Sequence, residues 1–149
     1  MLNSLKLAAT AALICFLPAL AGELDSKALT FKSADQLTWT GRPGGTQQAV
    51  LFGDPNKEGS LYGIMIKWAP NTGSRPHFHP NDRFIYVISG TWWVGTGAKY
   101  DADSMTAMKA GTSVTHYGKG IHYDGAKDEQ ATLEIVGIGP ATSTNAEQK

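Results

Sequence analysis

Apolar residues recur along the chain in short runs that are rich in β-branched and aromatic side chains. Turn-forming sequences, such as Arg42-Pro-Gly-Gly45 and Pro70-Asn-Thr-Gly73, separate these runs. No segment shows a helical periodicity of apolar positions. The pattern predicts an all-β fold, an antiparallel sandwich or small barrel, with strands over residues 37–40, 48–52, 61–68, 83–89, 91–94, 112–117 and 131–138.

The first residues have a different pattern. Lys6 precedes a long apolar stretch that ends in Ala19-Leu20-Ala21. A cation, a short apolar stretch and a small-x-small end are typical of a secretory signal peptide, and the stretch is too short to span a bilayer comfortably. We therefore expect residues 1–21 to be removed, the mature protein to be periplasmic and free of any membrane attachment, and the single cysteine, Cys15, to leave with the signal peptide.

Length and charge restrict the remaining possibilities. The 149 residues suit one domain, and we expect an N-terminal extension over residues 22–36, the folded domain over 37–141 and a flexible polar tail over 142–149. The 13 Lys and Arg residues balance 13 Asp and Glu residues, so the chain lacks the basic surface that binds nucleic acid. No phosphate-binding glycine loop or nucleophile–histidine–acid order supports nucleotide or hydrolase chemistry.

The four histidines fall in two short segments. His77 and His79 flank Phe78, so on a strand both imidazoles would leave the same face, as metal chelation requires. His116 and His122 follow about forty residues later, on either side of a glycine-rich turn. This clustering favours a metal or ligand site over scattered surface histidines.

Residues 71–90 resemble the first sequence motif of the cupins: a glycine, two histidines separated by one residue, a glutamate and a final glycine. The spacing from His77 to Gly90 matches throughout, but Asn71 replaces the first glycine and Arg83 replaces the glutamate. The likeness is greatest to small exported bacterial cupins. It implies a jelly-roll barrel, an antiparallel double sheet, with a pocket in its mouth, and a homodimer.

The second cupin motif is matched less completely, at Gly111 and His122. Tyr117, Lys119 and Ala126 replace its proline, glycine and asparagine. The resemblance implies that His77, His79 and His122 hold a divalent transition metal: Zn, Cu, Fe, Mn or Ni. Cupins include dioxygenases, isomerases and lyases as well as binding proteins, so the resemblance does not select a reaction.

Arg83 determines how far the likeness extends. Counting in twos from His79 places Arg83 in the pocket, where a guanidinium cannot ligate a metal but can bind the carboxylate of an anionic substrate. Alternatively, Glu134 or Asp124 neutralises Arg83 inside the barrel. The sequence therefore also allows a metal-free cupin that binds a small anion at Arg83 without catalysis.

His116 also has more than one interpretation. It could be a fourth metal ligand in place of the glutamate, a residue that orients His122, or part of the pocket wall. The turn between His116 and His122 breaks the alternation, so residue parity cannot decide. We favour the last two roles over that of a ligand.

Overall fold

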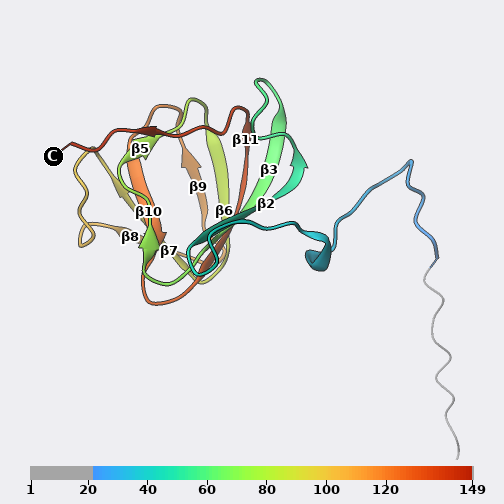
Figure 1. The fold of residues 1–149 in the computed structure, drawn as a ribbon, viewed down its shortest axis with the longest axis horizontal. Coiled ribbons are helices and arrows are strands. Elements are labelled where there is room, and N and C mark those ends of the chain that lie inside the picture. The colour runs from blue at the N-terminus through green and yellow to red at the C-terminus, as the bar shows by residue number, and fades with distance from the viewer. Residues whose placement is uncertain (1–21, 149) are drawn as a thin grey trace, which may run out of the picture. The chain divides into compact units, whose positions relative to one another are not determined.

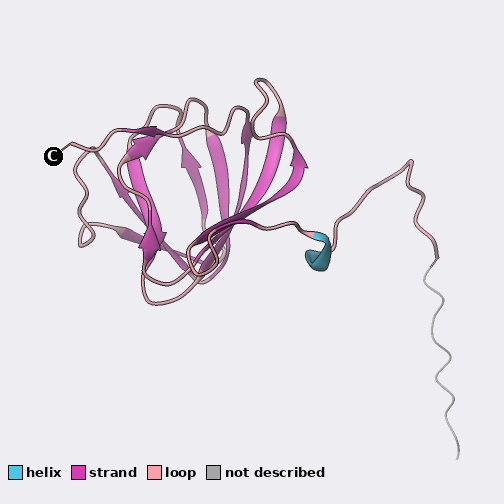
Figure 2. Cartoon of the chain, viewed as in Figure 1, coloured by secondary structure: helices cyan, strands magenta, loops and turns pink. Residues whose placement is uncertain are grey.

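The structure, a computed structural model, describes residues 22–148, and it divides them into two units at Phe31 and Lys32. The predicted signal peptide lies outside the described residues. The second unit begins with a single 3-10 turn, η1 (Ala34–Gln36), and is otherwise built of strands (Figure 2). Among the described residues, no helix has the length and apolar character needed to cross a membrane.

The strands form two antiparallel sheets that enclose a barrel-like interior (Figure 1). The first sheet has the order β1 (Thr40–Gly41), β2 (Thr46–Gly53), β3 (Leu61–Trp68), β11 (Ala131–Ile138), β6 (Arg83–Ser89) and β9 (Ser113–His116). The second has the order β12 (Thr144–Asn145), β5 (His77–Phe78), β10 (His122–Ala126), β7 (Thr91–Thr96) and β8 (Thr106–Lys109), with β4 (Thr72–Gly73) also paired to β10. The prediction of an antiparallel double-sheet, all-β fold is confirmed.

The period of two along the strands determines which side chains face the interior. In β6, Ile85 and Val87 are buried, whereas Phe84 and Tyr86 are exposed. β3 and β11 contribute the matching inner face, and the core consists of Tyr62, Ile64, Ile66, Trp68, Ile85, Val87, Trp92, Val94, Ala126, Ala131, Leu133 and Ile135. Arg83 has the parity of Ile85 and lies at the end of this inner face.

Both cupin-like motifs keep a left-handed backbone at their glycine positions, even where the residue differs. Asn71 has φ 58° and Lys119 has φ 64°, while Gly90 and Gly111 have φ 72° and 90°. A left-handed conformation costs an ordinary residue about 1–2 kcal/mol, so glycine is the usual choice. The turn geometry is therefore retained despite the substitutions at Asn71 and Lys119.

The observed strands differ from the predicted runs in several places, and β4, β5, β8 and β12 lie outside those runs. Of the run over residues 37–40, only Thr40 is in a strand, because β1 pairs with β2 through residues 40 and 41 alone. β10 was not predicted, since its sequence, His-Tyr-Asp-Gly-Ala, has no apolar alternation. It is nevertheless buried throughout: its register places it between β5 and β7, and the Tyr123 ring packs against Tyr100 outside the barrel.

The C-terminal segment, which was expected to be a flexible polar tail, is paired with the second sheet. β12 pairs with β5, the Ala146 amide donates to the Pro76 carbonyl at 2.9 Å, and Arg75 forms an ion pair with Glu147. The open backbone edge of β5 explains this pairing, because hydrogen bonds to that edge do not require apolar side chains. The segment therefore covers β5, which carries His77.

Candidate metal centre

A cavity of about 180 Å³ lies inside the barrel, between the two sheets. Its lining combines core side chains, such as Ile66 and Leu133, with polar ones. The titratable side chains of the lining are His77, His79, Arg83, His116 and Asp124. A concave site with apolar surface and convergent polar groups is the usual form of a small-molecule site.

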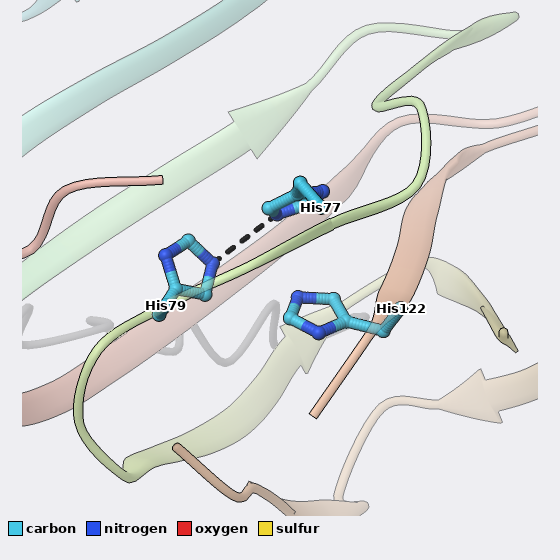
Figure 3. Close-up of side chains that lie close together, drawn as sticks. All are labelled: His77, His79 and His122. Carbon is cyan, nitrogen blue, oxygen red and sulfur yellow. Dashed lines mark hydrogen bonds between the residues drawn. The ribbon is translucent and has the colours of Figure 1, made fainter. Parts of the chain in front are cut away.

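Three histidines from two neighbouring strands lie close together beside this cavity, and two of them, His77 and His79, line it (Figure 3). His77 is on β5, His79 directly follows β5, and His122 begins β10, where it is the direct register partner of His77. One potential ligand atom from each lies within 4.8 Å of the other two. The structure thus brings together the three residues predicted as metal ligands.

Each of these histidines uses its Nδ1 atom in the same way. His77 Nδ1 contacts the Arg75 carbonyl at 2.8 Å, His79 Nδ1 the Thr142 carbonyl at 2.9 Å, and His122 Nδ1 the Gly120 carbonyl at 2.9 Å. Because a carbonyl only accepts, Nδ1 carries the proton in each neutral ring, and Nε2 carries a lone pair. Backbone carbonyls therefore fix the orientation of all three rings, as they commonly do for histidines that bind metals.

The Nε2 atoms have few partners among the described residues, and that of His79 accepts a hydrogen bond from Arg83 Nη1. His122 Nε2 is buried without any hydrogen bond, and the Nε2 atoms of His77 and His79 face each other at 3.2 Å (Figure 3). Two lone pairs at this distance repel unless a cation lies between them. The donor set fits a divalent transition metal, because three imidazole nitrogens are a ligand set that catalytic zinc sites use.

Burial keeps the rings of His79 and His122 in the ligand form. Burial lowers the pKa of His79 to about 3, and the positive charge of Arg83 lowers it further. Burial also lowers the pKa of His122. Both imidazoles are therefore neutral at pH 7, and neutral imidazole is the form that coordinates a metal.

Arg83 points into the cavity, as its parity predicted. Its Nη1 donates to His79 Nε2, while its Nε is buried without a partner. Among residues 22–148, no carboxylate lies within the 4.0 Å of an ion pair with Arg83. A buried guanidinium that lacks an ion pair can accommodate an anion.

The two carboxylates considered as partners of Arg83 have other environments. Glu134 lies on the outer face of β11, because it alternates with the buried Leu133 and Ile135. Asp124 does line the cavity, but its carboxylate accepts a hydrogen bond from the Ser74 hydroxyl. It acts on Arg83 only through its charge, which partly offsets the lowering of the Arg83 pKa by burial.

His116 lies next to the three-histidine cluster and outside it. It ends β9 opposite Arg83 in register, and its ring centroid is 3.8 Å from that of His122 and 5.4 Å from that of Trp92. Its Nε2 is buried without a partner, and burial lowers its pKa to about 2. It therefore contributes an uncharged wall beside His122.

Sequence reasoning missed the groups that orient the histidines. They are the backbone carbonyls of Arg75, Gly120 and Thr142, and no side chain identifies them. It also missed Ser74, whose hydroxyl holds Asp124 at the cavity wall. The sequence offered one indication of two of these carbonyls, because Arg75 and Gly120 each precede by two residues the histidine that they orient.

No protein-family model and no curated protein matches the sequence. Solved structures do match. The polyketide cyclase RemF from Streptomyces resistomycificus has a TM-score of 0.65 at 16% identity, over 81% of this chain and 87% of that one. KdgF from Halomonas sp. has a TM-score of 0.57 at 15% identity, over 74% of this chain and 94% of that one.

A further match is itself described as a cupin. The RmlC-like cupin from Shewanella frigidimarina gives a TM-score of 0.58 at 17% identity, over 72% of this chain and 88% of that one. At such low identity, these likenesses show the fold and leave the activity open. The chain therefore has a cupin fold.

Proposed function

We propose that this protein is an exported single-domain cupin that binds one divalent transition metal through His77, His79 and His122 and takes a small anionic organic molecule at Arg83. The convergence of three carbonyl-oriented imidazoles on one point carries the metal part of the proposal. Zn, Cu, Fe and Ni suit imidazole donors, and Mn is the least suited of the candidates.

The roles of the protein groups follow from their positions. A bound metal with an open position would supply Lewis-acid or redox chemistry. Arg83 would hold the carboxylate of the ligand through paired N–H donors, and the apolar walls from Ile66 and Leu133 would exclude water. The same arrangement serves a metalloenzyme or a metal-dependent binding protein, and the polyketide cyclase among its structural neighbours shows that such a barrel can support catalysis.

Metal binding tests this proposal with a matched pair of variants. Mature protein without a histidine tag is stripped with EDTA, freed of EDTA, and titrated with Co²⁺ or Zn²⁺ by calorimetry. We expect one metal per chain in the wild type and in His116→Gln, and no stoichiometric binding in His122→Ala. Retention of full binding by His122→Ala would contradict the proposed ligands.

A metal-free function is the second candidate, because Arg83 is itself a suitable anchor. Its Nε is buried without a partner, and Nη1 already donates to His79. In this alternative the cavity binds a small anion without metal or catalysis. Carboxylate binding that persists in EDTA and is lost in Arg83→Met would favour it, whereas no binding in EDTA would exclude it.

Export rests on the sequence of residues 1–21 alone. Fractionation of cells that express the full chain should place a shortened protein, beginning after Ala21, in the periplasm. Full-length protein in the cytoplasm or membrane would contradict this part of the proposal.

A further inference from the structure

One atom in the cavity has two competing uses. His79 Nε2 is the atom through which His79 would bind a metal, because its Nδ1 is engaged by the Thr142 carbonyl. The same Nε2 accepts a hydrogen bond from Arg83 Nη1. A nitrogen lone pair cannot serve both partners, so metal binding through His79 requires the Arg83 donor to move away.

Charge makes the same competition stronger. Arg83 is partly buried, its Nε is enclosed without a partner, and Asp124 is the carboxylate that shares the cavity lining. A divalent ion among the three histidines, together with Arg83, would outweigh the single negative charge of Asp124 and leave a net positive charge. Charges of one sign in a shared site repel, so Arg83 should lower the affinity of a metal that binds without an anion.

We infer that a small carboxylate and the metal bind this cavity together, each raising the affinity of the other, with Arg83 as the coupling residue. The inference rests on the proposed function. A carboxylate accepts two parallel hydrogen bonds from a guanidinium, and it thereby draws the Arg83 donors away from His79 Nε2. Its negative charge also offsets the positive charge that Asp124 alone leaves unbalanced.

The cavity limits the size of this anion. Its volume of about 180 Å³ is below the ~300 Å³ at which sites for drug-sized ligands begin. The ligand class is therefore a small mono- or dicarboxylate.

The coupling has an expected size. A hydrogen bond to a charged group contributes about 1.5–3 kcal/mol, and release of the one between Arg83 and His79 corresponds to about a 10- to 100-fold change in Kd. We expect saturating acetate or malonate to lower the Kd for Co²⁺ at least tenfold. By reciprocity, Co²⁺ should lower the Kd for the anion by the same factor.

The test is a Co²⁺ titration of metal-free wild-type protein at pH 7.5, in acetate, in malonate, and in sodium perchlorate of equal ionic strength. Perchlorate controls for charge screening. Chelation of Co²⁺ by free malonate would weaken the apparent affinity, so tighter binding has the opposite sign to this artefact. The visible absorption spectrum of Co²⁺ reports its coordination independently of any activity.

Two variants assign the effect to Arg83. Arg83→Met removes the charge and the donors, and Co²⁺ should bind it tightly with less than a twofold effect of acetate. Arg83→Lys keeps the charge and loses the paired donors, so its acetate effect should be smaller than that of the wild type. Circular dichroism confirms that each variant is folded.

The possible failures are distinguishable. Stoichiometric Co²⁺ binding with the same Kd in acetate and perchlorate would overturn the coupling and leave the metal site standing. A tenfold acetate effect that persists in Arg83→Met would overturn the role of Arg83. Absence of Co²⁺ binding under every condition would overturn the proposed metal site itself, and the coupling with it.

Discussion

Acidification should strongly destabilise the metal-free protein, and the loss should begin at a pH higher than that at which carboxylates titrate. His79 and His116 are buried, with pKa values lowered to about 3 and about 2, whereas a histidine in the unfolded chain titrates near 6.5. Between these values the unfolded state binds protons that the native state does not. The free energy of unfolding therefore falls as the pH drops below about 6.5, and it is unaffected above that value.

The magnitude depends little on the native pKa values, provided that they stay below about 4. For each such histidine, lowering the pH from 7.5 to 5 reduces the free energy of unfolding by about 2 kcal/mol, because each pH unit below 6.5 contributes ~1.4 kcal/mol. His79 and His116 together give about 4 kcal/mol. His122, whose pKa is also lowered, adds to the fall.

Urea unfolding of EDTA-treated protein at several pH values from 5 to 7.5 measures this directly. In His116→Phe, which fills a similar volume beside Trp92 without a titrating group, the fall should be about 2 kcal/mol smaller. A profile that is flat from pH 7.5 to 5 would refute the conclusion that these rings are buried and neutral. An unchanged slope in His116→Phe would refute the contribution of His116.

Three further predictions concern the departures from the cupin pattern and the outer surface. Arg83→Glu should tighten metal binding by restoring a carboxylate ligand, and weaker binding in calorimetry would show that Arg83 supports the site. Lys119→Gly should leave the free energy of unfolding unchanged or raise it by up to about 1 kcal/mol. Lys119→Ile should lower it by more than about 1 kcal/mol, because a β-branched residue disfavours the positive φ of this turn. Equal stabilities of the two variants in urea unfolding would contradict this prediction. The expected homodimer remains a prediction, and its proposed contact is the exposed set Leu61, Phe84 and Ile138 on the outer face of the first sheet. Sedimentation should give twice the chain mass for the wild type and the mass of a monomer for the double variant Phe84→Lys/Ile138→Lys. A monomeric wild type would refute the homodimer.

Much of the fold and of the cluster could be predicted because both depend on short-range spacing. The alternation in residues 83–89 places Arg83 on the same face as Ile85, and the structure shows it there. The His77-Phe78-His79 spacing places two imidazoles together, the likeness to the second cupin motif implies His122 beside them, and the structure brings the three together. The same alternation in β11 could have excluded Glu134 as a partner of Arg83, because its neighbours Leu133 and Ile135 face the core.

Other features depend on contacts that no local pattern encodes. β12 pairs with β5 across more than sixty residues, through backbone groups that any polar sequence offers. The carbonyl of Thr142 that orients His79 comes from this same segment. The contact between Arg83 and His79 depends on side-chain conformations inside the assembled barrel, which residue parity alone does not give.

The metal content of the mature protein tests the central claim most directly. The protein is purified from periplasm without a histidine tag and measured by elemental analysis beside the His77→Ala/His122→Ala double variant. The account predicts one transition metal per chain in the wild type and none in the double variant. Less than about a tenth of an equivalent in the wild type, even after incubation with each of Zn, Cu, Fe, Mn and Ni, would contradict it.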